Sequence, residues 1–365
     1  YEFNGICFCL VAVFIAVIMV FAVLTGCSGP KRTGENENAA GQSTDAGKSA
    51  GTADPANNGG ASDTSGSSGT SDPSDTTETP EFPITVTDGN GDEMVIKSAP
   101  QRIISLTLGS DEVLFSLVDK SRIASLTRYV EDEGISNIAA EAKGIGARTT
   151  MDQVEKIIAL NPDLIILDTW ADPNYIKQLR DAGITVYAFK TPSNIEEQKD
   201  VIAELAHVVG ADEKGQELIR WMDEKLNEIN EKLSVLKPEE KLTVMDYGEL
   251  GSSGKGTNFD DIVTRAGLIN VISRAGIEGW PVISKEKIIE FNPDIILLPS
   301  WYYDENNSFE SLRDTLKNDP SLQTVNAIKN DRIISVPNPH ISAISHYVVL
   351  AVEDVAKAAY PELFE

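Results

Sequence analysis

Cysteine is nearly absent from this 365-residue chain, and its three cysteines, Cys7, Cys9 and Cys27, all lie close to the start. A domain folded from residues 83–365 therefore contains no disulfide, and its stability must come from a hydrophobic core. Those 283 residues are long enough to bury such a core.

Positive charge is also scarce, because 31 Lys and Arg residues stand against 57 Asp and Glu residues, for a net charge of −26. No basic stripe is present, which excludes nucleic acid as the expected partner. An acidic surface also keeps a protein soluble, so the charge alone identifies no function.

Histidine and catalytic motifs are equally sparse. The three histidines, His207, His340 and His346, have no spacing typical of metal ligands. The pair Gly254-Lys255 resembles part of a phosphate loop, but the preceding glycine is wrongly spaced and Gly256 replaces the Ser or Thr. No G-x-S-x-G motif occurs. We therefore predict no enzymatic activity, no cofactor and no metal site, with His340 in its loop a candidate to face a cleft.

The start of the chain carries an unbroken apolar run, residues 6–24, followed by Leu24-Thr25-Gly26-Cys27. This ending resembles the lipobox of bacterial lipoprotein signal peptides, in which the cysteine is acylated. Residues 1–27 are accordingly predicted to be a signal peptide that leaves Cys27 lipid-anchored on the extracytoplasmic face of the cell membrane. A plain transmembrane anchor is the alternative. Tyr1 follows no Met and no basic segment, so we expect residues upstream.

Residues 28–82 are rich in Gly, Ser, Thr and Asp and have no aromatic residue before Phe82. Such a segment cannot bury enough apolar surface to offset the entropy of ordering. It is predicted to be a disordered tether.

One stretch is used twice. Residues 155–170 read EKIIALNPDLIILDTW and residues 286–301 read EKIIEFNPDIILLPSW, with ten of sixteen positions identical. Each copy predicts a helix that ends at Asn before Pro, then a fully buried strand, then Trp. A unit repeated once over a long interval indicates two similar lobes.

The pattern around the repeat predicts an α/β fold of two Rossmann-like lobes with open, mainly parallel sheets joined by a long, rigid α-helix. We assign the lobes to residues 83–193 and 237–365 and the linking helices to 194–236. The further elements that we expect are a hairpin at 85–96, strands at 102–106, 123–127, 184–188, 242–246 and 332–336, a loop at 144–150 with a capping box at 150–153, and helices at 194–209, 212–236 and 343–359.

Aromatic residues follow the predicted strands. Ligands bind beyond the carboxyl ends of strands in open α/β sheets, and aromatic faces offer large contact areas at small entropic cost. We therefore predict a ligand site in the cleft between the lobes, although some of these side chains could instead pack within a lobe. The predicted ligand-binding residues are Tyr129, Trp170, Tyr247, Trp280 and Trp301.

The order of motifs, T-V-T-D-x-x-G, P-x-R-I-I-S-L and two copies of E-K-I-I-x-x-N-P-D around a long helix, resembles a known family. It is similar to the iron-siderophore and cobalamin binding proteins of ABC importers, the periplasmic binding protein class with one rigid linking helix. The resemblance implies little closure on binding and one carboxylate per lobe that docks onto arginines of the permease dimer. By position these are Glu155 and Glu286. A glutamate in a first turn is also favoured by the helix macrodipole alone.

The ligand implied by this resemblance is a metal chelate, namely a ferric siderophore, cobalamin or haem. The spacing from Trp280 to Glu286 is similar to that of the vitamin B12-binding member, whereas Thr149 stands where that member has a Trp. Candidate cations for a catecholate, Arg128, Arg148, Lys190 and Lys255, are scattered. We expect a corrinoid or haem, then a hydroxamate siderophore. The alternatives are an acidic surface lipoprotein that binds a peptide or partner protein, and a cleft enzyme.

Overall fold

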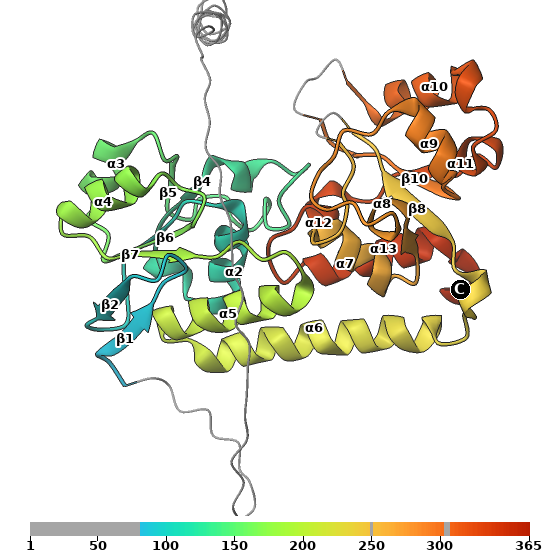
Figure 1. Cartoon of the computed structure of the whole chain (residues 1–365). Helices are drawn as coiled ribbons and strands as arrows, with labels where there is room; N and C mark the ends of the chain where they lie inside the picture. The colour runs from blue at the N-terminus through green and yellow to red at the C-terminus, as the bar shows by residue number, and fades with distance from the viewer. Residues whose placement is uncertain (1–80, 249–250, 303–306) are drawn as a thin grey trace, which may run out of the picture. The chain divides into compact units, whose positions relative to one another are not determined.

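In the computed structural model, residues 81–248, 251–302 and 307–365 are described (Figure 1). The predictions of a signal peptide, of lipidation at Cys27 and of nearly all of the tether lie outside these residues. Within them, no helix combines the length and apolar character needed to cross a membrane.

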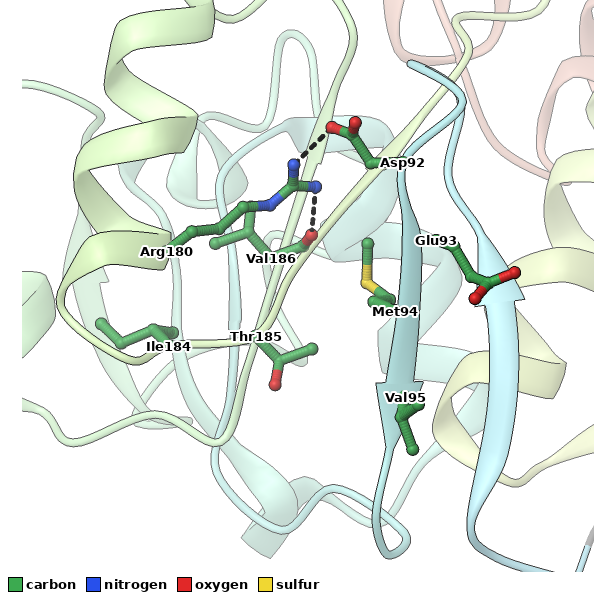
Figure 2. A pocket seen from close by; sticks show the side chains of 8 residues that line it. All are labelled: Asp92, Glu93, Met94, Val95, Arg180, Ile184, Thr185 and Val186. Atoms are coloured by element: carbon green, nitrogen blue, oxygen red, sulfur yellow. Dashed lines mark hydrogen bonds and ion pairs between the residues drawn. The ribbon is translucent and has the colours of Figure 1, made fainter.

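The described chain opens with the predicted hairpin, in which β1 (Ile84–Thr87) pairs antiparallel with β2 (Glu93–Ile96). Arg180 joins this hairpin to the first lobe by binding Asp92 while donating to the Val186 carbonyl (Figure 2). It also binds Asp88. The Gly89 N–H donates to the Ala188 carbonyl at 2.6 Å. The carbonyls of Val186 and Ala188 point outward from the edge strand at residues 186–189. Because the hairpin and Arg180 donate to them, this edge is protected from pairing with another chain.

The first lobe is built on a five-stranded parallel sheet in the order β5-β4-β3-β6-β7. Nearly all residues of β3, β4, β6 and β7 are buried, so these strands are covered on both faces, whereas two of the three residues of the edge strand β5 are half-buried. The loop predicted at 144–150 contains a strand, because residues 147–149 pair with β4. The strands are β3 (Ile103–Ser105), β4 (Ile123–Thr127), β5 (Ala147–Thr149), β6 (Leu164–Asp168) and β7 (Val186–Phe189).

Helices and short 3₁₀ turns connect these strands. Thr107 caps the first helix, because its hydroxyl accepts a hydrogen bond from the Ser110 N–H. Its backbone is extended, as is typical of a residue that caps a helix. The connecting elements are α2 (Leu108–Leu117), η1 (Lys120–Arg122), η2 (Arg128–Glu131), α3 (Val154–Ala159), α4 (Pro173–Asp181) and α5 (Ile195–Val209).

The second lobe has a four-stranded parallel sheet in the order β11-β10-β8-β9. Its strands are β8 (Thr243–Asp246), β9 (Ile269–Asn270), β10 (Ile295–Leu297) and β11 (Ile333–Ile334). The surrounding helices are α7 (Asn258–Arg265), α8 (Val271–Arg274), α9 (Lys285–Phe291), α10 (Phe309–Asn318), α11 (Asn326–Lys329), α12 (Asn338–Ile341) and α13 (Val348–Ala359), with 3₁₀ turns η3 (Pro238–Glu240), η4 (Pro320–Leu322) and η5 (Pro361–Leu363).

The two copies of the repeated unit adopt the predicted conformation. Asn161 and Asn292 have φ values of 47° and 45°, so each takes the left-handed conformation that ends its helix. The predicted capping box at 150–153 is wrong, because the Gln153 N–H donates to the main-chain oxygen of Thr150 and no side chain caps α3. In the second copy, Ser284 does cap α9.

Two helices join the lobes. α5 is capped by Asn194 and ends at Gly210, whose φ of 69° is the left-handed region. α6 (Asp212–Leu233) follows at once, and its 22 residues span about 33 Å. It ends three residues before the predicted Leu236.

A single cluster of buried apolar side chains runs from the first lobe into the second. It includes Ile103 of β3, Met222 of α6, Val244 of β8 and Val352 of α13. α13 packs against both α6 and α7 (Figure 1). The predicted fold class is therefore confirmed, and the lobes share one core instead of meeting only through a linker.

Candidate functional site

The strand order of the first lobe creates a crevice at one place. β3 lies between β4 and β6. After β3 the chain forms β4 and β5 on one side of it, and then crosses to form β6 and β7 on the other side. Connections on opposite sides leave a crevice beyond the carboxyl ends of the two central strands. Thr107 follows β3 and Asp168 ends β6, which places both at this crevice.

A cavity of about 180 Å³ occupies this position and is closed by the second lobe. Gly109 makes the close approach possible, because a Cβ there would lie 2.3 Å from the carbonyl oxygen of Ile344. Thr191 Oγ1 is buried without a hydrogen-bond partner in the described ranges, and burial raises the pKa of Asp168. The lining residues are Thr107, Leu108, Gly109, Glu112, Ile135, Asp168, Phe189, Thr191, Ser342, Ala343 and Ile344.

A buried carboxylate ties the two lobes together beside this cavity. Glu112 on α2 accepts from the Asn137 N–H at 2.7 Å and from the Ser345 hydroxyl at 2.5 Å. Asn137 Nδ2 also donates to Glu112 and to the carbonyl of Pro339. Burial raises the pKa of Glu112, and these bonds oppose that rise by favouring its ionised form. Removing one of them would leave a costly buried acceptor, so the junction is specified by polar contacts as well as by its core.

Trp301 makes a second contact between the lobes. Its side chain is half-buried, and a Cβ on Gly134 of the first lobe would lie 2.2 Å from its Cδ1. The indole of this predicted ligand-binding residue therefore packs against the turn around Gly134.

A larger cavity, of about 740 Å³, lies beyond the ends of β4 and β5. Tyr129 is 44% exposed at its rim, and the guanidinium carbon of Arg128 lies 5.3 Å from the centre of its ring. The lining residues are Leu106, Thr127, Arg128, Tyr129, Arg148, Thr149, Thr150, Met151, Asp152, Gln153 and Lys156.

The two arginines of this cavity differ in their availability. Arg148 is occupied, because it pairs with Glu131 at 2.9 Å and donates to the carbonyls of Ala142, Ile145 and Ala147. In the described part of the chain, Arg128 has no hydrogen bond or ion pair. It lies beside the ring of Tyr129, and its charge contributes, after a hydrogen bond from Thr150, to the lowered pKa of Asp152, another residue that lines this cavity. Of the two guanidinium groups, that of Arg128 is thus the more available to an incoming anion.

A buried acid holds the strand end that presents Arg128 and Tyr129. Asp111 on α2 is fully buried and accepts from both the N–H and the hydroxyl of Thr127, the last residue of β4. Burial raises the pKa of Asp111 to about 7 despite these hydrogen bonds. The position of the cavity rim therefore depends on a carboxyl group that changes charge near neutral pH.

The remaining predicted aromatic residues do not gather in this cavity. Trp170 follows β6 and is 78% exposed, and Trp280, in the loop before α9, is 63% exposed. Tyr247 follows β8 and lines a separate cavity of about 350 Å³ with Tyr302. The structure thus places the five residues at strand ends and loops, as predicted from their positions, without bringing them into one pocket.

Glu155 and Glu286 lie in the first turns of α3 and α9, and both are exposed. A hydrogen bond from Ser284 and a main-chain N–H of the helix lower the pKa of Glu286. These positions agree with the predicted geometry, and the docking role stays a prediction.

The histidines serve other contacts. His340 Nδ1 lies 2.5 Å from Asp354 Oδ2, and burial lowers the pKa of His346 to about 4 where its ring packs on Tyr347. No group of three or more His, Cys, Asp and Glu side chains in residues 81–248, 251–302 and 307–365 is arranged to hold a metal ion.

Sequence reasoning missed Asp111, Glu112, Asn137 and Ser345. The signal for the first two was present, because two adjacent acids lie among uncharged residues in the helix at 108–117. Neither Asn137 nor Ser345 carries a local pattern, since each acquires its role only through contacts distant in the sequence.

Comparison with known proteins gives a consistent result. The family described as periplasmic binding protein matches residues 103–339. YvrC, an uncharacterized ABC transporter substrate-binding lipoprotein of Bacillus subtilis, is 26% identical over 300 residues, covering 79% of this chain and 89% of the relative. A cobalamin-binding protein of Halobacterium salinarum is 20% identical and is covered over 58% of its length. The structure of the molybdate-bound protein MolA of Haemophilus influenzae shares the fold, with a TM-score of 0.63, 21% identity and coverage of 77% and 92% of the two chains.

The raised pKa of Asp111 predicts a pH-dependent stability. Between pH 4 and 7 the unfolded state has lost this proton and the folded state keeps it, so the free energy of unfolding falls as pH rises through this window. Asp111→Asn should remove that pH dependence. As the pH rises from 4 to 8, the free energy of unfolding of the variant should therefore increase by a few kcal/mol relative to that of wild type. Urea denaturation at several pH values measures the effect.

Asp119→Asn is the control, because hydrogen bonds from Ser121 lower the pKa of exposed Asp119. Its contribution has the opposite sign and is lost as pH falls. If the free energy of unfolding changes with pH in the same way for wild type and Asp111→Asn from pH 4 to 8, Asp111 is not the titrating group.

Proposed function

Because the chain belongs to the periplasmic binding protein family, we propose that it is the substrate-binding lipoprotein of an ABC importer and delivers a metal chelate to its permease. The family comprises solute-binding proteins, not enzymes. We extend this to the chain itself: it binds its ligand reversibly and releases it chemically unchanged.

The 740 Å³ cavity beside Tyr129 and Arg128 is the observation that carries the choice of ligand. Its volume lies within the range of small-molecule sites, roughly 300–1,000 Å³. A flat aromatic ring next to a guanidinium that forms no ion pair among the described residues suits a large planar chelate with a negatively charged edge. Haem and corrinoids have this form, and a ferric hydroxamate is the next candidate.

The smaller cavity at the lobe junction would take a projecting polar group of the same ligand. Thr191 Oγ1 lacks a partner there among the described residues, and burial raises the pKa of Asp168. At about 180 Å³ the cavity alone is too small for a whole chelate but is large enough for a small oxyanion. Trp170, Tyr247, Trp280 and Trp301 are proposed as further ligand contacts.

Ligand binding is tested by titrating the purified protein with cobalamin, haem, a ferric hydroxamate and molybdate while following tryptophan fluorescence. One chelate should bind with one-to-one stoichiometry and be recovered unchanged. Tyr129→Ala should weaken its binding by about fivefold or more, since truncating an aromatic anchor costs over about 1 kcal/mol. Tyr175→Phe, which removes a buried hydroxyl on α4, is the control.

Three outcomes contradict this proposal. Turnover of the bound compound would favour a cleft enzyme. Binding of molybdate alone would favour a small oxyanion. A protein that ignores all four compounds and binds a peptide or another protein would favour the acidic surface lipoprotein.

We also propose that Cys27 is acylated and anchors the chain to the extracytoplasmic face of the cell membrane. The lipobox-like ending at residues 24–27 and the lipoprotein relative YvrC support this. Wild type and Cys9→Ser should incorporate labelled fatty acid, and globomycin should block their processing. Cys27→Ser should incorporate none. A mature protein that retains residues 1–26 would identify a transmembrane anchor instead.

Glu155 and Glu286 are proposed to contact basic residues of the two permease subunits. Exposed ion pairs contribute only about 0–1 kcal/mol each, so they should govern orientation and encounter more than affinity. Glu155→Ala combined with Glu286→Ala should leave chelate binding unchanged and abolish uptake. Lys at both positions should be worse, because it adds repulsion.

The matched control is Glu213→Ala with Glu310→Ala, since these are also exposed glutamates in first turns but lie outside the repeat. This pair should transport normally. Wild-type uptake by the Glu155 and Glu286 variant, at equal protein levels, would leave those glutamates as helix-start residues only.

A further inference from the structure

An exposed isoleucine accompanies each of the two proposed docking glutamates. Ile158 is 41% exposed in α3 and Ile289 is 38% exposed in α9. Each follows its glutamate by three residues, which puts the carboxylate and the apolar side chain on one face of the helix. Ile157 and Ile288, one position earlier, are fully buried, so the exposed residue is not the one that fills the core.

An exposed position on these helices does not have to carry the same residue in both copies, and it does not have to be isoleucine. The next residue along, also exposed in both copies, is Ala159 in α3 and Glu290 in α9. The two helices also begin differently, since Ser284 caps α9 and no side chain caps α3. A neighbouring surface position and the helix start thus differ between the lobes, while Glu-x-x-Ile is the same in both.

The two faces are open to a partner. In Figure 1, α3 and α9 both lie on the side away from α6, one in each lobe. Neither isoleucine belongs to an apolar cluster of the described residues. The chain is strongly acidic, so a complementary partner is basic.

We propose that Glu155 with Ile158 and Glu286 with Ile289 form two equivalent docking patches for the permease dimer, in which the isoleucines determine the lifetime of the complex. The inference rests on the proposed function. Each permease subunit would present a cationic group beside an apolar pocket. The isoleucine enters that pocket, and the carboxylate directs the approach.

The size of the effect follows from the exposed area. Burying the exposed two-fifths of one isoleucine side chain should tighten binding by about fivefold, and both together by about 25-fold. Apolar contacts formed on docking slow dissociation, whereas surface charges accelerate association and are screened by salt. The two residue types should therefore change different rate constants.

The test measures association of the full chain, loaded with its chelate, with its ABC permease in lipid nanodiscs. Ile158→Ser combined with Ile289→Ser should dissociate about 25-fold faster, with unchanged chelate affinity and unchanged dependence of association on salt. Ile158→Met with Ile289→Met restores apolar area and should behave nearly as wild type. Val95→Ser with Val235→Ser, at exposed apolar positions outside the repeat, should have no effect.

The glutamate variant completes the design, because it should slow association and flatten its salt dependence while leaving dissociation nearly unchanged. If wild type binds the permease and the double Ser variant dissociates at the same rate, this inference is overturned and the proposed function stands. If wild type does not bind the permease at all, both are overturned.

Discussion

The shared apolar core constrains everything else in this structure. Its side chains come from β3 in the first lobe, α6 in the link, and β8 and α13 in the second lobe. Swinging the lobes apart would expose that surface to water at roughly 25 cal/mol per Å². The buried carboxylate of Glu112, which needs Ser345 across the junction, opposes the same motion. The shared core and this hydrogen bond therefore both resist separation of the lobes that border the crevice.

The candidate site depends on that rigidity. Three residues at the start of α2 face three different parts of the structure. The N-cap Thr107 faces the crevice, Asp111 faces the end of β4, and Glu112 faces the second lobe. One short helix thus fixes the cavity floor, the loop that carries Arg128 and Tyr129, and the position of residues 342–345. Preformed sites of this kind bind without a large entropic cost of ordering.

Most of the fold could be predicted from local patterns, because Asn-Pro helix ends and apolar strand runs are encoded within a few residues. Asn161 and Asn292 are examples. β5 was missed because glycines at 144 and 146 favour a loop, and only pairing with β4 makes residues 147–149 a strand. At the site, the sequence indicated the strand-end residue Tyr129. It could not indicate that Gly109 meets Ile344 or that Asn137 donates to the carbonyl of Pro339, because those two contacts join residues about 200 or more positions apart.

The continuous core has a consequence for competition at the membrane. If the lobes barely move, the empty protein presents nearly the same outer surface as the loaded one, and a permease that reads this surface will accept both. Empty copies then act as inhibitors of import. The flux of solute is set by the ratio of loaded to empty protein, and producing more of the binding protein than the available solute can fill slows uptake.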